Sequence, residues 1–352
     1  MADSTVVTQC IICSTTRKLR KCQGCHVVSY CGRDHQAYDW GLHKMICKCL
    51  KKLQDDLHRE EERLRSLPGD GIRPEFHSGP VGSLFEEAHE YARFWEIPET
   101  QEYMTIRQAM VQGLLEIKTL EAVQAAQRHC TFMIWVNPPD DLDIRDIVMP
   151  LYIRLGAIQR CYDELKWCAE EGSDPLYDWG RPRETMQHIE ANRDILEDVN
   201  DFLREYVSLS LKVAVTLIKV TFLLQVQSLR NAAILSKRLP QEIVDCVGRQ
   251  AVNRDVLKKK EIMDSECHES VIKKLEMQIR IMYVAVKRDS PQVWSELLKP
   301  RQHIPKYVSA RQKYRNEPES VQAVVRYNYF SWIETPGALE VIKDLAQHFD
   351  TR

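Results

Sequence analysis

Eight cysteine and histidine side chains lie close together near the start of the chain, and thiolates and imidazoles are groups that bind zinc in proteins. The chain of 352 residues has twelve cysteines, and six of them fall within residues 10–47. With two histidines they form four pairs: Cys10 and Cys13, Cys22 and Cys25, Cys31 and His35, and His43 and Cys47. A closed structural zinc site takes four ligands, so the eight residues predict two zinc ions per chain.

The spacing within each pair predicts where its ligands lie. A Cys-x2-Cys turn lets two sulfurs converge at about 2.3 Å from one metal ion, so we expect the first two pairs in loops. Ligands four residues apart share one face of a helix, so we expect the last two pairs at helix ends. A cluster of buried cysteines is the alternative, but so short a polar segment has no core in which to bury them. Cys49 fits no ligand position and is predicted to be a spare thiol.

The order of these ligands and the residues between them resemble the MYND-type zinc finger. The resemblance includes Tyr30 before Cys31, Gln36 after the sixth ligand, Trp40, and "HKMIC" at the end. It implies interleaved sites, with one zinc held by Cys10, Cys13, Cys31 and His35 and the other by Cys22, Cys25, His43 and Cys47. The chain has His35 where the family usually has cysteine, and imidazole is an ordinary zinc ligand. RING and PHD fingers also interleave two zincs, but they expect a longer spacer and another ligand order.

Both predicted zinc sites are closed, which leaves no coordination position for activating water. The finger would therefore present a surface and not catalyse. The resemblance implies that this surface binds short proline-containing peptides, with Gln36 and Trp40 in the groove. An indole face suits a proline or leucine side chain, and a glutamine amide can pair with a peptide backbone. The alternative is that Trp40 forms the core of a tiny domain, and one residue can do both.

Composition changes along the chain predict three parts. Residues 1–49 have few large aliphatic side chains and need metal to fold; we assign them to the zinc finger. Residues 50–82 contain a charged helical segment with leucines at helical spacing and then a Pro/Gly-rich linker. Residues 83–352 show helical periodicity and almost no strand pattern, which predicts an all-α domain with a core separate from that of the finger. The predicted fold is thus a small interleaved two-zinc finger followed by an all-α helical domain.

Three finer predictions concern the helical domain. Ser83 and Glu86 form a capping-box pattern at the start of a helix. Residues 183–238 predict two long helical runs. The most apolar segment, residues 206–229, contains Lys212 and Lys219 on one helix face, which predicts a core helix with one solvent-exposed edge and not a membrane span.

Charge and cysteine usage indicate the setting of the protein. The net charge is −2, so nucleic acid is an unlikely partner, although residues 1–52 carry nine Lys or Arg against three Asp. The first ten residues lack the apolar stretch of a secretory signal. Clustered thiols without that signal predict an intracellular protein of the cytoplasm or nucleus. Cys161 and Cys168 are predicted to pack inside helices, with a redox or metal pair as the alternative.

The helical domain carries no motif of known catalysis. Residues 149–170, 297–301 and 321–342 resemble an uncharacterised group of fungal MYND proteins with a long helical C-terminal region, which implies an architecture and no mechanism. Some MYND proteins are SET-type methyltransferases, but SET chemistry needs Gly-rich turns, the chain has 13 glycines, and "DSECHES" (264–270) does not match the cofactor motif. We therefore predict a protein–protein interaction protein, an adaptor or transcriptional co-regulator, and not an enzyme. The alternative is an enzyme with an unrecognised active site in the helical domain.

Overall fold

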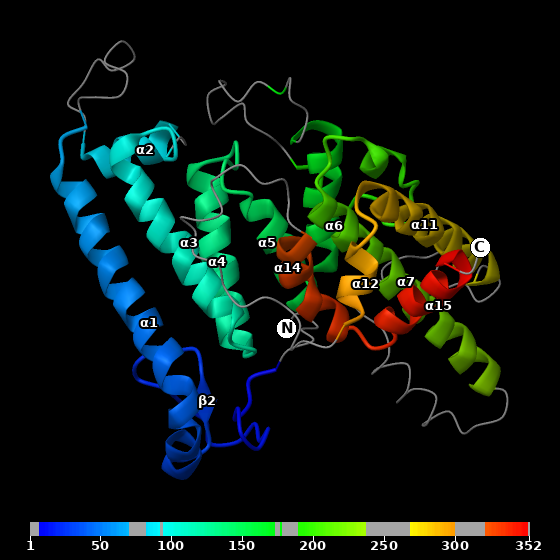
Figure 1. The fold of residues 1–352 in the computed structure, drawn as a ribbon, viewed down its shortest axis with the longest axis horizontal. Coiled ribbons are helices and arrows are strands. Elements are labelled where there is room, and N and C mark those ends of the chain that lie inside the picture. Colours follow the sequence, from blue (N-terminus) through cyan, green and yellow to red (C-terminus); the bar gives the residue numbers. More distant parts are fainter. Residues whose placement is uncertain are drawn as a thin grey trace.

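A two-stranded hairpin and a row of helices make up the described part of the chain (Figure 1). The computed structural model describes residues 7–69, 82–91, 94–172, 177, 189–236, 268–299 and 321–350. Strands β1 (Arg20–Lys21) and β2 (Ser29–Tyr30) are antiparallel, and Arg20 pairs with Tyr30. The predicted fold, a small finger followed by α-helices, is confirmed.

The α-helices follow the finger in chain order, with three short helical turns between them. The α-helices are α1 (Arg33–Ser66), α2 (Leu84–Tyr91), α3 (Gln101–Leu115), α4 (Leu120–Val136), α5 (Ile144–Arg154), α6 (Ile158–Trp167), α7 (Leu209–Ser236), α11 (His268–Asp289), α12 (Val293–Leu297), α14 (Val321–Ile333) and α15 (Ala338–Asp350). The turns are η2 (Pro98–Thr100), η3 (Cys168–Gly172) and η5 (Asn200–Leu203). In Figure 1, α1 forms one edge of the row, and α11 and α15 lie at the other.

Helix α1 connects the finger to the rest of the chain. It runs without a break through residue 49, where we predicted the finger to end. Its buried face repeats every seven residues through Leu50, Leu57 and Leu64, and this face packs on α2 and α3. A Cβ on Gly113 of α3 would lie 2.9 Å from the Leu50 side chain, so glycine permits the close approach of α1 and α3. The predicted domain ranges stay a prediction, and most of the Pro/Gly linker lies outside the described residues.

The finger and the helices share one apolar core, so the prediction of two separate cores is wrong. Val27 and Val28, between the finger's strands, are buried in the same cluster as the residues of α3 and α4. The Thr119 hydroxyl at the start of α4 donates to the Val27 carbonyl, and the Ser29 hydroxyl donates to the Glu121 carboxylate at 3.5 Å. These contacts join residues 92 positions apart, which a linear composition profile does not reveal.

Helix α7 is the central helix of the C-terminal half. It contacts α5, α6, α11, α14 and α15. By length and composition, its segment Leu209–Ala232 is the one described helix that could cross a membrane, but 83% of its most apolar window is buried inside the fold. The prediction of a core helix is therefore confirmed.

The predicted solvent-exposed edge of α7 is wrong, because both of its lysines are buried. The Lys212 ammonium forms an ion pair with Asp289 of α11 at 2.6 Å. The Lys219 side chain is fully buried, and its amino group donates to the carbonyls of Ile195 and, at 2.9 Å, Glu197. Buried polar groups with such partners cost far less free energy than unpaired ones, which is how a core helix tolerates two lysines.

Two other local predictions have different outcomes. The capping box of α2 is confirmed, since the Ser83 N–H donates to the Glu86 carboxylate at 3.1 Å and the Glu86 N–H donates to the Ser83 hydroxyl at 3.4 Å. The two long helical runs over 183–238 are not found, because residues 189–208 are irregular apart from η5 and only α7 follows. The Asp163 carboxylate accepts hydrogen bonds from the N–H groups of Asn192 and Arg193, which holds that segment outside helical geometry.

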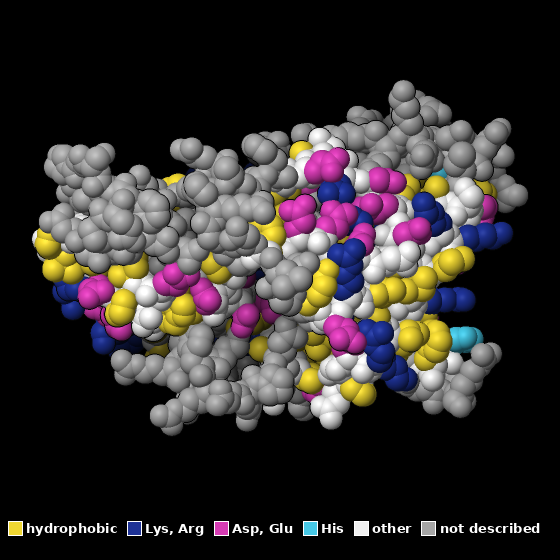
Figure 2. Space-filling model, turned by 90° about the horizontal axis from the view of Figure 1, so that it is seen from above, with side chains coloured by type: hydrophobic (Ala, Val, Ile, Leu, Met, Phe, Trp, Pro, Cys, Tyr) yellow, Lys and Arg dark blue, Asp and Glu magenta, His cyan; other side chains and the backbone are white. Residues whose placement is uncertain are grey.

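Charged side chains of the helical domain form ion pairs of mixed sign. Lys166 of α6 lies 2.6 Å from Asp201 and 3.2 Å from Glu197. Buried Arg154 of α5 makes two 2.8 Å hydrogen bonds to Glu334, just after α14. On the described part of the face shown in Figure 2, acidic and basic side chains lie next to one another.

Candidate metal centre

The two Cys-x2-Cys segments of the finger have the same local structure. Cys10–Cys13 and Cys22–Cys25 both form turns, as predicted. In each turn, the residue after the second cysteine donates its N–H to the carbonyl of the first cysteine at 2.9 Å, from Ser14 and His26 respectively. Both of these residues have left-handed backbones, with φ of 56° and 59°. The shared turn places the two sulfurs of each segment on one side.

The eight predicted ligands converge in two groups of four. Within each group the sulfur and nitrogen atoms all lie within 4.8 Å of one another. The first zinc group consists of Cys10, Cys13, Cys31 and His35, and the second zinc group of Cys22, Cys25, His43 and Cys47. Each group takes its first two members from a turn and its last two from further along the chain, so the sites interleave as the resemblance implies.

The distances within the groups fit tetrahedral zinc. With zinc–sulfur bonds of about 2.3 Å and zinc–nitrogen bonds of about 2.0 Å, a tetrahedron separates two sulfurs by about 3.8 Å and a sulfur from a nitrogen by about 3.5 Å. The sulfurs of Cys13 and Cys31 are 3.7 Å apart, and Cys25 Sγ lies 3.5 Å from His43 Nε2. All described cysteines are free of disulfides. The finger therefore contains two Cys3His zinc-binding sites, as its composition predicts.

The two histidines present different ring nitrogens to their groups. His35, in the first turn of α1, turns Nδ1 toward Cys10 at 3.5 Å and Cys31 at 3.1 Å. His43, two turns further along α1, uses Nε2. Cys31 itself lies just before α1, and the pair His43 and Cys47 lies well inside this 34-residue helix, not at a helix end as predicted.

Hydrogen bonds and charge at the sulfurs favour a bound cation. Burial by itself raises the pKa of Cys10, but hydrogen bonds from the backbone N–H groups of Cys13, Cys31 and Ile12 outweigh it and lower the pKa to about 6. Burial, with the nearby sulfurs of Cys22 and Cys25, raises the pKa of Cys47 to about 12. Three thiolates at such short distances repel one another, and a divalent cation among them removes that repulsion.

The second cysteine turn, Cys22–Cys25, packs tightly against the other members of the second zinc group. A Cβ on Gly24 would lie 2.6 Å from Cys47 Sγ, so a residue with a side chain at position 24 would clash with that sulfur. The His43 ring is held between two aromatic edges, with the Tyr30 centroid at 6.2 Å and the Trp40 centroid at 6.3 Å. The buried Tyr30 hydroxyl donates to Asp39 at 2.6 Å, which fixes the start of α1 against β2.

The two predicted peptide-binding residues lie on the α1 face that carries the second zinc group. Gln36, Trp40, His43 and Cys47 follow one another at intervals of three or four residues, so they share that face. Trp40 is 39% exposed, which shows one side of the indole to solvent while an edge contacts His43. Among the described residues, none forms a hydrogen bond with the side-chain amide of the half-buried Gln36.

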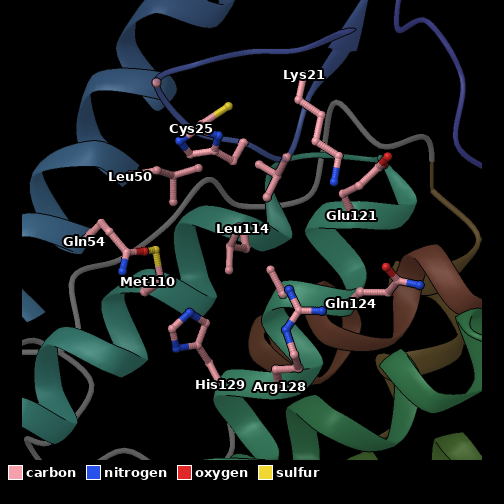
Figure 3. A pocket seen from close by; sticks show the side chains of 14 residues that line it. Lys21, Cys25, Leu50, Gln54, Met110, Leu114, Glu121, Gln124, Arg128 and His129 are labelled. Carbon is pink, nitrogen blue, oxygen red and sulfur yellow. The ribbon is translucent and has the colours of Figure 1, made fainter. Parts of the chain in front are cut away.

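A cavity of about 380 Å³ lies between the finger and helices α1, α3 and α4 (Figure 3). Its floor is apolar, with Leu50, Met110 and Leu114, and its rim carries Lys21 and Arg128. The sequence did not predict this cavity, because its walls come from four segments that only the shared core brings together. Cys161 and Cys168 lie elsewhere, fully buried, and burial raises the pKa of Cys168 to about 12, as expected of packed thiols.

An interleaved pair of Cys3His sites, built from two cysteine turns and helix α1, defines a two-zinc finger, a class that mediates protein–protein contacts. Residues 10–47 match the family model described as the MYND finger. This match covers the finger and leaves the helical part of the chain unassigned; no solved structure matches the chain. The resemblance of the helical part to a fungal group stays a prediction.

Similar curated proteins share a short segment with this chain. A hypoxia-inducible factor prolyl hydroxylase of Caenorhabditis elegans is 45% identical over 53 residues, which are 14% of this chain and 7% of that protein. The Rho GTPase-activating protein gacZ of Dictyostelium discoideum is 42% identical over 53 residues, 15% of this chain and 5% of its own. The histone-lysine N-methyltransferase ASHR1 of Arabidopsis thaliana is 42% identical over 48 residues, 14% of this chain and 10% of its own. The chain thus matches a small part of each relative's length, and their different activities do not transfer through it.

Proposed function

We propose that the chain is an intracellular protein–protein interaction protein, an adaptor or transcriptional co-regulator, whose finger holds two zinc ions through the eight residues of the two zinc groups. Each group supplies four ligands, so a bound zinc has no open position and serves to fold the finger. The finger then acts through the surface that the zinc sites stabilise. No catalytic role is assigned to the finger.

The ligand that we propose for this surface is a short proline-containing peptide. The observation that carries the proposal is the half-exposed Trp40 indole, which is supported from behind by the zinc-site residue His43. An indole held in this way offers a flat apolar face to proline or leucine at little cost in side-chain entropy. Gln36, one helical turn away, has its amide free to pair with the backbone of the same peptide.

Replacing Gln36 with alanine should weaken peptide binding about fivefold, because one hydrogen bond contributes about 1 kcal/mol. The measurement is isothermal titration calorimetry of the full chain with a peptide of the Pro-x-Leu-x-Pro type. Gln36 is no zinc ligand, so the variant should keep two zincs. Trp40→Ala should abolish binding, but it also removes a contact of His43 and is the less specific probe.

The matched control for this experiment is Gln54→Ala. Gln54 is on the same helix, but it lines the cavity beyond the second zinc group and not the proposed peptide surface. Its replacement should leave the peptide affinity at the wild-type value. Equal affinities for wild type and Gln36→Ala, with two zincs in each, would show that the peptide site lies elsewhere or does not exist.

A further inference from the structure

A row of exposed apolar side chains follows α1 on the side away from the zinc groups. Tyr38, Leu42 and Met45 are 80%, 87% and 82% exposed. With about 100° of rotation per residue, their spacing confines them to an arc of about 60°. We call these three residues the Tyr38–Met45 stripe. Large apolar side chains exposed singly are ordinary on a protein surface, but three in one line over two helical turns mark a contact surface.

The stripe is exposed because nothing described packs on that side of α1. The opposite face carries His43, Cys47 and Leu50, which are buried against the finger and α3. In Figure 1, α1 is the outermost helix of the row, with α2 and α3 on one side of it only. The backbone of the stripe is held rigidly from behind, since His43 and Cys47 belong to a zinc group. A partner would therefore meet a preformed helix.

The charge beside the Leu42 and Met45 part of the stripe has one sign, whereas Asp34 and Asp39 lie near its Tyr38 end. Between Trp40 and Gln54 the chain has no acidic residue and four exposed lysines, which are Lys44, Lys48, Lys51 and Lys52. On a helical projection all four lie on the same flank of the stripe. Within the described part of the chain, no carboxylate lies within 4.0 Å of these lysines. Further along α1, by contrast, basic residues are neutralised by neighbours such as Asp56 for Arg59 and Glu60 for Arg63.

We propose that the Tyr38–Met45 stripe binds an amphipathic helix of a partner protein that presents apolar residues to the stripe and Asp or Glu residues along one flank. Apolar contact at three- and four-residue spacing is how two helices pack along their length, and methionine adapts readily to a partner's shape. Acidic residues on one flank of the partner would lie opposite the lysines and set its direction. This site is distinct from the peptide surface of Gln36 and Trp40, which lies on the other side of α1.

The same charges argue against the two other occupants. A second copy packed antiparallel about a two-fold axis would bring its own lysines toward those of the first, which like charges oppose. An anionic lipid surface matches the lysines, but a helix lying in a bilayer needs an apolar face wider than three side chains. An amphipathic partner helix with acidic residues along one flank matches both the narrow apolar stripe and the lysines on one side of it.

The test uses the full zinc-loaded chain and two synthetic amphipathic helices with leucines at i, i+4 and i+7. One carries glutamates along one flank, and its twin carries lysines there. Fluorescence anisotropy should show binding of the acidic helix and none of the basic helix, and Leu42→Glu should weaken binding at least about tenfold. A variant with Lys44→Glu, Lys48→Glu and Lys51→Glu should reverse the preference. Unchanged zinc content in each variant establishes that the finger is folded.

Several results would overturn the proposal. Equal binding of the acidic and basic helices, or undiminished binding by Leu42→Glu, would remove the stripe as the site. Binding of the chain to phosphatidylserine vesicles without binding of the acidic helix would assign the surface to a membrane. A dimer in analytical ultracentrifugation that Leu42→Glu dissociates would assign it to a second copy. Gln36→Ala is the matched control and should bind the acidic helix as wild type does.

Discussion

Cys22→Ser should remove zinc from the second group and destabilise the whole N-terminal half of the chain. Cys22 is 3% exposed, and its sulfur lies 3.6 Å from that of Cys47, so a serine there leaves three ligands in a closed space. A structural zinc contributes on the order of 10 kcal/mol to the folding of a small finger, which is comparable to the entire stability of a domain. Because Val27 and Val28 share a core with α3 and α4, we expect the loss to extend into these helices.

Circular dichroism during heating, with zinc analysis of the same sample, measures both effects. We expect a lower melting temperature and a smaller helical signal than in wild type, with fewer than two zincs bound. Cys49→Ser is the matched control, since Cys49 is an exposed cysteine of α1, two residues after the ligand Cys47, and belongs to neither zinc group. A Cys22→Ser protein with two zincs and wild-type melting would contradict the assignment of Cys22 as a ligand.

The free energy of unfolding should increase with pH between 7 and 10. Lys219 should contribute the part of this increase that corresponds to one additional proton bound in the unfolded state. Burial lowers the pKa of Lys219 to about 7, against the opposing charges of Glu197 and Asp194. Between this value and the ordinary lysine pKa, the unfolded state binds more protons than the folded state, so raising the pH favours folding. The free-energy cost of burying the charged Lys219 amino group is present in full below pH 7. It vanishes as the pH approaches the pKa of lysine in the unfolded chain.

Denaturant unfolding at several pH values measures this slope. One proton corresponds to at most about 1.4 kcal/mol per pH unit, and Lys219→Met should lose that part of the wild-type slope. Lys212→Met is the matched control, because it removes the other buried lysine of α7, which forms an ion pair with Asp289. Identical slopes for wild type and Lys219→Met would show that Lys219 is protonated throughout this range in the folded protein.

The metal groups could be predicted from the sequence because most of their geometry is local. Each cysteine turn and each i, i+4 pair is set by a few residues of backbone, and the capping box of Ser83 and Glu86 is equally local. The spacing of the ligands does not predict which cysteine turn shares a zinc ion with which pair of α1 or its start; the resemblance to the MYND finger implies this assignment. The lengths of the segments between pairs permit other combinations, and only the folded hairpin brings the four pairs into two groups.

The errors arose where a partner lies far away in the sequence. Helical periodicity predicts that a lysine lies on the solvent-exposed face of a helix. Lys212, however, forms an ion pair with Asp289, 77 residues later in the chain. Lys219 donates to backbone carbonyls of a segment more than 20 residues earlier. The shared core was missed for the same reason, since Val27 meets Thr119 across 92 residues. Single-residue patterns carry no information about such contacts.

Zinc content tests whether residues 10–47 hold two Cys3His sites. Elemental analysis of the full chain, purified without added metal and after removal of loosely bound ions, should give two zincs per chain. Cys49→Ser should also give two, because all eight ligands remain. One zinc or none per wild-type chain would contradict the interleaved two-zinc finger and every function proposed for its surface.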